Sequence, residues 1–384
     1  MNLKTFLKRN RFAYYAYYYV ASFFINFYKL FVRTDNHLIL FVCYGGRHYS
    51  DSTRVIYEAM LNDDRFSGYK IVWAFTRPEN YPFIPNKVNI DSFEYIKMAL
   101  KARCWVTNVI VERALNFTGK HTYYFHTTHG VLCKLDGYDA KQSKNFKSLA
   151  KCHFDCCTVQ SEIERKIYSG MIGLDQEKIK VVGVAKNDIL VHYSDDYRKQ
   201  IRQKLGILPN KKAILYAPTF REEDNFLERF DVNVELWQKI LGDEFVLLYR
   251  AHPVVESVNK GGDSFFKDVT GYEVVEDIMI AADILISDYS GIIFDFCIME
   301  KPIFLWTYDY DNYNKIRGLY FDIRKELPYK ADEKELIEMI KGFDLSVNVK
   351  EYVRPFKKKY ATEFGNGTKN ALNLIYDNID ATKN

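Results

Sequence analysis

A histidine and a lysine follow one of the apolar runs of this chain in a pattern suited to proton and phosphate chemistry. The segment TYYFHTTHG ends in His129 and Gly130, and Lys134 lies shortly after it. A histidine can act as a general base near neutral pH, and a glycine lets the backbone turn closely. The Lys134 ammonium group could bind a phosphate. In the structural alternative, His129 only closes the loop by hydrogen bonding.

Cationic side chains also follow two later apolar runs. Thr219 and Arg221 come after AILYAP, and Arg250 and His252 come after FVLLY. Guanidinium groups bind phosphates in a bidentate manner, and a spacing of two places both side chains of the second pair on one face. These turns therefore predict anion binding. The alternatives are an ordinary surface arginine at 221 and an arginine–acid pair beside a buried neutral histidine at 250–252.

The segment SDYSG lies between the strand-like run DILI and the helix-like segment IIFDFCIME. The first N–H groups of a helix are unpaired and carry the positive end of its dipole, so they attract anions. The hydroxyl groups of Ser287 and Ser290 add donors, and Asp288 and Gly291 complete the turn. We therefore predict a phosphate cradle here. Simple capping of the helix by Ser290 is the structural alternative.

The cysteines favour free thiols over a metal site. The chain has seven of them, an odd number that fits buried thiols in a reducing compartment. Cys152, His153, Cys156 and Cys157 cluster, but no second cluster with zinc-ligand spacing accompanies them. A Walker loop is absent, and GGRHYS at 45–50 lacks the dinucleotide fingerprint. The sequence therefore requires no metal, and we expect no NAD site.

Parallel strands are needed to position these turns, and the apolar pattern predicts them. Short runs rich in Val, Ile and aromatic residues alternate with helix-like segments such as 51–61 and 92–102. Nearly continuous apolar runs are typical of buried parallel strands, and their alternation with helices predicts βαβ units. The runs lie at 38–43, 69–75, 104–111, 122–130, 155–161 and 179–183, and then at 211–220, 245–253, 272–276, 282–291 and 301–306.

The runs form two series, separated by a segment without such a run at about 190–210. This pattern predicts an α/β protein of two doubly wound, Rossmann-like domains. We place the first domain at 36–195, a linker at 196–210 and the second domain at 211–345. One helix is expected to end near Gly206, and helices at 346–384 are expected to pack back across the domains. The carboxyl ends of both sheets would then face a shared cleft, where ligands of open α/β sheets bind.

Residues 1–35 are dense in aromatic side chains and form a separate segment. No charge occurs from Phe12 to Tyr28, which is close to the shortest length for a membrane span. The many tyrosines favour helices that lie on the cytoplasmic membrane surface, because tyrosine prefers the bilayer interface. The alternative is an aromatic helix that packs onto the body of the protein. The flanking cations are Lys4, Lys8, Arg9, Arg11, Lys29 and Arg33.

Composition narrows the classes of partner. Charged residues make up 27% of the 384 residues, which argues against a polytopic membrane protein. The formal net charge of +4 fits an anionic partner such as a nucleotide, a phosphate polymer or an acidic membrane face. Zinc-finger spacings are absent, and we expect no nucleic-acid partner.

Taken together and in order, the turns resemble those of the CDP-glycerol glycerophosphotransferase family, whose members prime and polymerise teichoic acids in Gram-positive bacteria. The resemblance runs from about residue 38 to about residue 380. Its motifs are His129–Gly130 with Lys134, Gly137 and Asp139; KND at 186–188; YAPTFR at 216–221; RAHP at 250–253; ADILISDYSGIIFDF at 282–296; KPIFLWTYDYDNY from 301; and RGLYFD at 317–322.

The resemblance implies a GT-B fold and a donor of the CDP-alditol class, CDP-glycerol or CDP-ribitol. His129 would be the base that activates an acceptor hydroxyl, which attacks the phosphorus bearing the alditol as CMP leaves. The donor pyrophosphate would be bound by Thr219, Arg221, Arg250, His252, Ser287, Asp288, Ser290 and Gly291. Acceptor or phosphate contacts would come from Lys134, Asp139, Lys186 and Asn187, with Arg317 and Asp322 as further candidates.

The same resemblance implies a lipid-linked saccharide or polymer as acceptor and a peripheral location on the cytoplasmic side of the cell membrane. The product would be a teichoic acid or a phosphate-containing capsule, and the oligomeric state is left open. A GT-B glycosyltransferase that uses a UDP-sugar is an alternative with the same fold. A non-catalytic, membrane-bound polymer-binding protein is another.

The chain departs from the family pattern at three places. Val131 and Leu132 stand where the family usually has Thr-Pro after the His-Gly pair. The segment Gly183–Ala185 replaces a common Gly-Tyr-Pro before KND, and Gly291 replaces the second of two adjacent serines. These positions adjoin the expected acceptor and phosphate sites.

Overall fold

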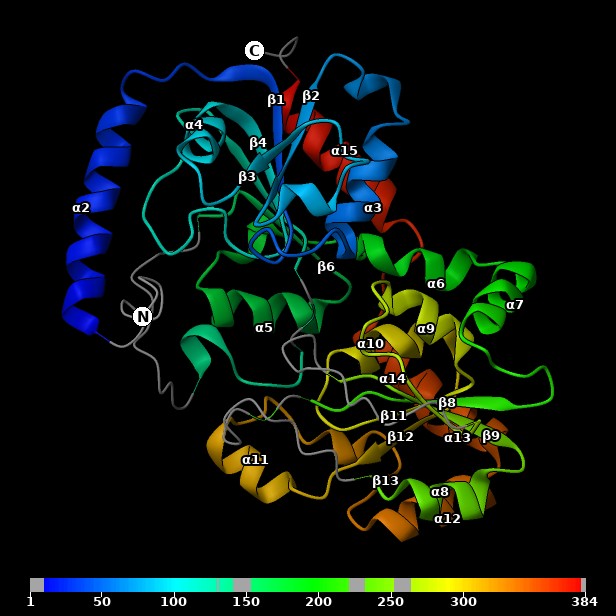
Figure 1. Cartoon of the computed structure of the whole chain (residues 1–384). Coiled ribbons are helices and arrows are strands. Elements are labelled where there is room, and N and C mark those ends of the chain that lie inside the picture. The colour runs from blue at the N-terminus through cyan, green and yellow to red at the C-terminus, as the bar shows by residue number, and fades with distance from the viewer. Residues whose placement is uncertain are drawn as a thin grey trace.

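Two parallel β-sheets, each with an apolar core on both faces, form the body of the molecule (Figure 1). The computed structural model describes residues 10–128, 130, 132–140, 153–219, 221, 232–251 and 264–380. His129 and His252 therefore lie outside the described residues. The predicted pair of doubly wound parallel-sheet domains is confirmed.

The first sheet has seven strands in the order β3-β2-β1-β4-β5-β6-β7. Its central strand β1 is buried from Leu38 to Val42, which explains the continuous apolar run. Helices α4 (Phe93–Lys101) and α5 (Glu162–Ile172) pack on one face, and α3 (Asp51–Met60) packs on the other. The strands are β1 (Asp35–Val42), β2 (Lys70–Phe75), β3 (Lys87–Asn89), β4 (Ala102–Thr107), β5 (Tyr123–His126), β6 (Cys156–Val159) and β7 (Ile179–Val181).

The second sheet has six strands in the order β10-β9-β8-β11-β12-β13. Helices α9 (Val275–Ala281) and α10 (Ile292–Phe296) pack on one face, and α8 (Val234–Leu241) and α12 (Glu333–Gly342) pack on the other. The strands are β8 (Lys212–Tyr216), β9 (Phe245–Tyr249), β10 (Phe266–Asp268), β11 (Ile284–Ser287), β12 (Ile303–Trp306) and β13 (Tyr329–Lys330).

Both sheets reverse their strand order at the centre. Strand β1 pairs with β2 on one side and with β4 on the other, and β8 likewise lies between β9 and β11. Loops on opposite sides of such a switch point diverge and leave a crevice beyond the carboxyl ends of the strands. The candidate turns after β5, β8, β9 and β11 all lie at these carboxyl ends, as expected.

Serine side chains fix the starts of several helices. The Oγ atoms of Ser92, Ser161 and Ser194 each accept a backbone N–H from the first turn of α4, α5 and α7. Gly173, with φ +67°, ends α5 in the left-handed region. The remaining helices are α6 (Ile189–His192), α7 (Asp195–Lys204), α11 (Tyr310–Ile316), α13 (Leu345–Asn348) and α14 (Arg354–Tyr360).

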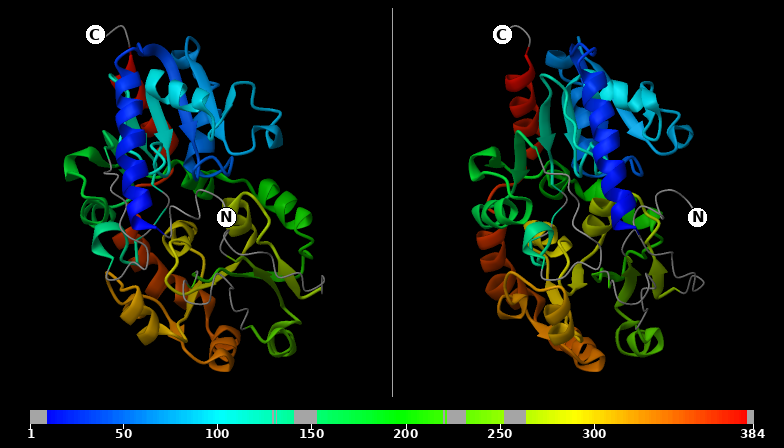
Figure 2. Two further views of the ribbon diagram at one scale, coloured as in Figure 1. Left: turned by 60° about the vertical axis from the view of Figure 1, so that its left-hand side comes forward. Right: turned by 90° about the vertical axis from the view of Figure 1, so that its left-hand side faces the viewer.

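The chain ends on the first domain after leaving the second. Helix α15 (Gly367–Ile379) buries Ala371 and Ile375 in the same core as α3 and β1, and Figures 1 and 2 show it beside the first sheet. The carboxylate of Asp188 accepts the backbone N–H groups of Gly367 and Thr368 at 2.8 and 2.7 Å. The C-terminal segment therefore crosses back from the core of the second domain, which holds Phe356 and Tyr360, to the core of the first.

Helix α2 (Arg11–Lys29) lies along the first domain (Figure 2). Tyr14, Tyr18 and Ser22 are buried on one face, and the Asn26 side chain donates to the Asn116 carbonyl oxygen at 2.7 Å. One face of α2 therefore packs on the body of the protein, and the predicted contact of its other face with a membrane stays a prediction. Within the described residues, no helix has both the length and the apolar character needed to cross a membrane.

Several expected elements differ from the structure. The run at 272–276 is not a strand: it forms a bend and the first residues of α9. The first N–H groups of a helix have no partner within it, which favours acids such as Glu276 and Asp277 there. The third strand along the chain in the second domain is β10 instead. The expected single helix before Gly206 is two helices, α6 and α7, separated at Tyr193–Ser194. The short edge strands β3 and β13 were not predicted.

Candidate active site

The turn after β5 is held on both sides of His129, which lies outside the described residues. The Thr127 N–H donates to the Thr107 carbonyl oxygen at 2.8 Å and continues the sheet ladder. Thr128 has φ +55°, a left-handed conformation that costs a β-branched residue about 1–3 kcal/mol. Gly130 has φ +76°, which suits glycine. A strained turn at the carboxyl edge of a sheet is typical of functional sites.

The turn after β11 is built around Asp288. Its carboxylate accepts the Thr219 N–H at 2.9 Å and the Tyr289 N–H at 2.6 Å. The Ser287 hydroxyl donates to the Ala217 carbonyl oxygen at 2.6 Å. Ser287 and Asp288 therefore join the turn after β11 to the turn after β8. The structural alternative, capping by Ser290, is not realised: α10 begins at Ile292, and its N-cap is Gly291, which has no side chain.

Arg221 is engaged by the protein itself. Its guanidinium group donates to Asp288 Oδ2 at 2.8 Å and to Asp309 Oδ2 at 2.7 Å, and it lies 4.8 Å from the centre of the Tyr313 ring. Burial disfavours the charge, but the two carboxylates outweigh burial and raise the pKa of Arg221. Arg221 therefore fixes the frame in which Thr219 and Asp288 lie.

Arg250 differs from Arg221 in its partners. Its Nη1 donates to the carbonyl oxygens of Tyr272 at 2.6 Å and Val269 at 3.3 Å. It forms no ion pair with an acid among the described residues, so the arginine–acid alternative is not realised. Burial lowers the pKa of Arg250, and Glu276 acts in the opposite direction. A buried cation without a bound carboxylate is a suitable partner for an anionic ligand.

Lys134 reaches the second domain through a short stretch of antiparallel pairing. Lys134 and Leu319 form an isolated β-bridge, and the Leu135 N–H donates to the Gly318 carbonyl oxygen at 3.0 Å. The Lys134 ammonium group makes no hydrogen bond or ion pair with the described residues. Burial lowers its pKa, and the nearby Asp288 carboxylate opposes that change.

The paired segments 132–139 and 317–320 form what we term the interdomain clasp. Arg317 Nη2 lies 3.1 Å from Asp136 Oδ1, and the Tyr320 hydroxyl donates to Asp139 Oδ2 at 2.7 Å. Leu132 and Cys133 are buried in the core of the second domain. The clasp therefore brings Lys134, Asp139 and Arg317 together, three of the residues singled out in the sequence. Asp322 instead caps a short helix and pairs with Arg324 at 2.9 Å.

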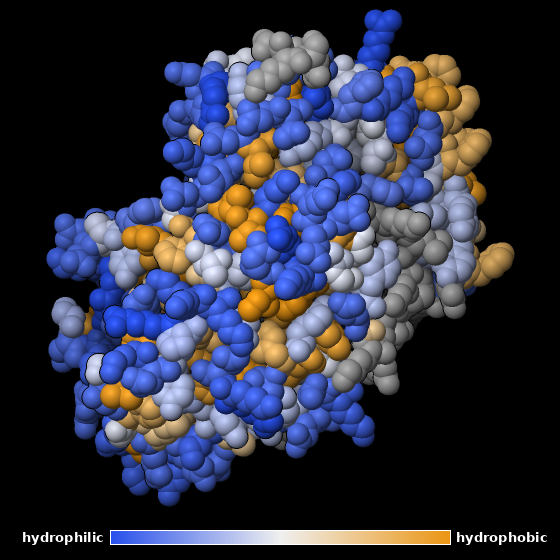
Figure 3. All heavy atoms as spheres, turned by 180° about the vertical axis from the view of Figure 1, so that it is seen from behind, coloured by the Kyte–Doolittle hydropathy of each residue, from blue (hydrophilic) through white to orange (hydrophobic). Residues whose placement is uncertain are grey.

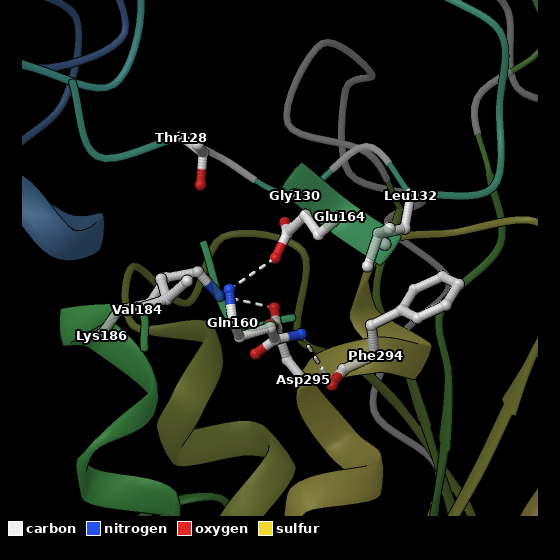
Figure 4. Close-up of a pocket in the computed structure, with 10 residues that line it drawn as sticks. Thr128, Gly130, Leu132, Gln160, Glu164, Val184, Lys186, Phe294 and Asp295 are labelled. Atoms are coloured by element: carbon white, nitrogen blue, oxygen red, sulfur yellow. Dashed lines mark hydrogen bonds and ion pairs between the residues drawn. The ribbon is translucent and has the colours of Figure 1, made fainter. Parts of the chain in front are cut away.

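Lys186 and Asn187 form a buried strut across the domain junction with Asp295 of α10. Figure 4 draws Lys186 and Asp295 among the residues that line the adjacent pocket. Lys186 Nζ lies 2.5 Å from Asp295 Oδ2 and 3.7 Å from Glu276 Oε1, and Asn187 Nδ2 donates to Asp295 Oδ1 at 2.7 Å. Burial disfavours the ammonium charge, but the two carboxylates outweigh burial and raise the pKa of Lys186. Asn187 also donates to Gln160 Oε1.

The pocket beside this strut is lined by both domains. The first domain contributes Thr128, Gly130, Leu132 and Glu164 to its lining, and the second contributes Phe294 (Figure 4). Glu164 Oε2 accepts the Gln160 N–H at 2.7 Å, and burial raises the pKa of Glu164 to about 7.

Two glycines, Gly130 of the first domain and Gly291 of the second, bring their backbones close together at this pocket. A Cβ atom added to Gly291 would lie 2.7 Å from the Gly130 carbonyl oxygen, a distance that no real Cβ contact shows. The start of α10 therefore touches the backbone of the turn that carries His129. Only a residue without a side chain permits this contact.

Sequence reasoning missed several residues of this region. One is Thr128, whose buried hydroxyl oxygen has no partner among the described residues; the same holds for Thr219, which the sequence did single out. Asp295, Gln160 and Glu164 were also missed. The acid inside the apolar helix segment IIFDF was the available signal, because a buried carboxylate needs a partner.

Cysteine and acidic side chains provide no metal centre in the described ranges. No group of three or more His, Cys, Asp or Glu residues there could hold an ion. The six described cysteines are free and buried. Cys152, the third cysteine of the CHFDCC cluster, lies outside the described residues.

Comparison with known proteins assigns this architecture to a family. Residues 24–378 match the family described as CDP-glycerol:poly(glycerophosphate) glycerophosphotransferase. The chain belongs to this family. The resemblance noted in the sequence motifs is thereby confirmed, and the glycerophosphotransferase match covers both sheets and the clasp between them.

Relatives of this glycerophosphotransferase family member occur in staphylococci. The teichoic acid poly(glycerol phosphate) polymerase of Staphylococcus epidermidis is 31% identical over 78% of this chain, which spans 45% of that protein. The teichoic acid glycerol-phosphate transferase of Staphylococcus aureus is 29% identical over 91% of this chain and 95% of its own length. The chain thus spans about half of the longer relative and nearly all of the shorter one.

Solved structures confirm the GT-B-like arrangement. A variant of the wall teichoic acid polymerase TagF soaked with CDPG superimposes with a TM-score of 0.81 and 27% identity, covering 91% of each chain. The UDP-GlcNAc 2-epimerase of Methanocaldococcus jannaschii, with a TM-score of 0.51 and 14% identity, shares the fold alone.

Proposed function

We propose that this chain transfers an alditol phosphate from a CDP-alditol to a hydroxyl group of a membrane-linked acceptor and releases CMP. The polymer would be a teichoic acid or another phosphate-containing cell-surface polymer. The observation that carries the proposal is the Gly130–Gly291 contact, which sets the turn bearing His129 against the turn expected to hold the donor. Family membership supplies the reaction class.

His129 is the proposed base. It takes the proton of the acceptor hydroxyl as that oxygen bonds to the phosphorus bearing the alditol. The bond from this phosphorus to the bridging oxygen breaks, and CMP leaves with the electron pair. Phosphoryl transfer depends mainly on positioning and on stabilising charge, so the neighbouring cations supply most of the remaining chemistry.

The proposed donor-binding residues fall into two groups. Arg250, His252 and Lys134, together with Arg317 of the clasp, neutralise the pyrophosphate, and the free hydroxyl of Thr219 donates to it. The others hold the frame: Arg221, Ser287 and Asp288 lock the turns, while Ser290 and Gly291 lead into α10. Lys186 and Asn187 hold the junction, and Asp139 holds the clasp.

Glycerol is the proposed alditol. The S. epidermidis and S. aureus relatives carry glycerol phosphate in their names. A poly(ribitol-phosphate) polymerase of Bacillus spizizenii is 28% identical over 65% of this chain, so CDP-ribitol is the second donor to be tested. The proposal requires no metal ion, because the cationic side chains can neutralise the pyrophosphate.

A donor panel tests the proposal. Purified full-length protein is incubated with CDP-glycerol, CDP-ribitol or UDP-sugars and with membranes that carry native acceptors, and released nucleotides are measured. We expect CMP from a CDP-alditol, and no CMP from His129→Ala, a variant whose circular dichroism spectrum should match that of the wild type. Release of UDP would instead assign a sugar transferase. Binding without release from any donor would favour a polymer-binding protein.

We further propose that α2 docks this enzyme on the membrane surface. Its outward face is apolar, and Figure 3 shows orange spheres along the edge on which the helix lies. Tyrosine and phenylalanine suit the bilayer interface, and Lys29, Arg33 and Lys120 near its C-terminal end can approach anionic headgroups. The exposed large apolar residues of α2 and of the two residues after it are Phe12, Tyr17, Tyr19, Val20, Phe23, Phe24, Phe27, Leu30 and Phe31.

Removing two of these rings should weaken membrane binding. Phe23 and Phe24 are 65% and 63% exposed, so their replacement by serine leaves the core intact. Burying a phenylalanine contributes about 1.5–3 kcal/mol, and we expect the double variant to bind anionic phospholipid vesicles at least about tenfold more weakly in cosedimentation. Leu61→Ser is the matched control, because Leu61 is 58% exposed but lies away from α2, at the C-cap of α3. Equal binding by all three proteins would refute docking through α2.

A further inference from the structure

His126 lies at the end of β5, immediately before the turn that carries the proposed base. Its side chain is 4% exposed. The imidazole stacks on the Phe154 ring, with centres 4.1 Å apart and planes 29° apart. Tyr168 of α5 approaches it from another side, with ring centres 6.2 Å apart. Packing therefore fixes the orientation of the imidazole.

Two potential donors converge on one nitrogen of this ring. The Thr128 N–H donates to His126 Nδ1 at 3.1 Å, and Cys157 Sγ lies 3.6 Å from the same atom. A backbone N–H can only donate, so Nδ1 must accept and cannot carry a proton. The arrangement therefore selects the neutral imidazole whose proton is on Nε2.

The hydrogen bond stabilises a backbone conformation that threonine rarely adopts. Thr128 leaves the sheet at φ +55°, whereas Thr127 still bonds to the neighbouring strand β4. The His126 imidazole takes the place of a strand carbonyl as the acceptor for the Thr128 N–H. A buried N–H without an acceptor would favour a different path for the turn.

We propose that His126 is a positioning residue for the transfer reaction: its Nδ1 fixes the backbone of Thr128, the residue immediately before the proposed base His129. The inference rests on the proposed role of His129. Gly130, on the other side of His129, is fixed independently by its contact with Gly291. The alternative is that His126 is only an aromatic core residue whose hydrogen bond has no effect on turnover.

Two substitutions separate the acceptor from the ring. His126→Phe keeps an aromatic ring against Phe154 but removes the acceptor. His126→Asn places a carbonyl oxygen at the position that corresponds to Nδ1 but removes the ring. If His126 positions the base, the variant that keeps the hydrogen-bond acceptor should keep its activity, and the variant that keeps the ring should keep its thermal stability.

The test measures CMP release and thermal unfolding of both variants in the full-length protein. We expect kcat of His126→Phe to fall by about 10- to 100-fold, because a displacement near 1 Å can cost about 100-fold, with KM for the CDP-alditol unchanged within about twofold. His126→Asn should restore most of kcat while unfolding at a lower temperature. Wild-type kcat in His126→Phe, or a loss of kcat in His126→Asn alone, would overturn the inference.

A second measurement does not depend on turnover. Nitrogen NMR of histidine-labelled wild type reports whether Nδ1 of His126 is unprotonated, with His126→Asn identifying the signal. An unprotonated Nδ1 supports the hydrogen bond even if no CDP-alditol is consumed, in which case the proposed function fails alone. A protonated Nδ1 overturns the inference whatever the donor panel shows.

Discussion

Substituting alanine for Gly291 should lower kcat of alditol-phosphate transfer by about 100-fold, since misplacing a catalytic group by about 1 Å can cost that much. The added Cβ atom would lie 2.7 Å from the carbonyl oxygen and 3.2 Å from the carbonyl carbon of Gly130. Both are backbone atoms, which cannot rotate away as a flexible side chain can. Either the turn at 128–130 or the start of α10 must move, and each movement separates the proposed base from the donor.

Gly342→Ala is the matched control for this experiment. Gly342 is the last residue of α12 in the same domain, and a Cβ atom there meets nothing within 4 Å. The two variants are compared by CMP release under saturating donor and by thermal unfolding. A Gly291→Ala enzyme that unfolds like the wild type and retains wild-type kcat would show that the glycine contact has no role in catalysis.

The chain departs from its family on both sides of this contact. Gly291 replaces a common serine, and Val131–Leu132 replaces a common Thr-Pro beside Gly130. A serine at 291 adds the same Cβ atom as alanine, so Gly291→Ser should also lower kcat in this chain. The two departures are therefore expected to be coupled: the close turn at Gly130 requires the missing side chain at 291.

The strands were predictable because burial leaves a direct mark on the sequence. A parallel strand covered on both faces, such as β1 or β9, must be apolar along its length, and each gave a continuous run. Strands at the sheet edges are short and carry less apolar sequence, so β3 and β13 passed unnoticed. The run at 272–276 misled because its two valines resemble a strand, whereas its glutamates belong to a turn and a helix start.

The location of the site was predictable from the sequence, but the partners of its side chains were not. Polar residues after apolar runs indicated the carboxyl edges of the sheets. Whether a cation faces a ligand or the protein depends on acids that are remote in sequence. Arg221 meets Asp309, 88 positions away, and Lys186 meets Asp295, 109 positions away. No local pattern reveals such partners, which is why both cations were expected to bind phosphate while the structure pairs them with carboxylates.

Removing Asp295 should destabilise the protein by about 3–5 kcal/mol, because breaking a buried ion pair leaves an uncompensated charge. The Lys186 and Asp295 side chains are 7% and 14% exposed, and Asp295 also accepts from Asn187. Asp295→Leu fills the site in α10 with an apolar side chain. The Lys186 ammonium group then has only the Glu276 carboxylate, 3.7 Å away, as an acidic partner in this pair of contacts. The free energy of unfolding is measured by urea denaturation, with Lys199→Met as the control, because Lys199 pairs with Asp196 on the exposed surface of α7.

The double variant Lys186→Met/Asp295→Leu tests whether the strut is stabilised by the attraction between the two charges or by the packing of the side chains. It removes both buried charges, so we expect it to be more stable than Asp295→Leu alone and the two single effects to be non-additive by about 0.5–3 kcal/mol, the range for residues in contact. Glu276 then loses its cation, and because burial already raises its pKa it can become neutral by binding a proton. Strictly additive losses would mean that Lys186 and Asp295 stabilise the domain junction separately, through packing, and that the ion pair between them contributes nothing.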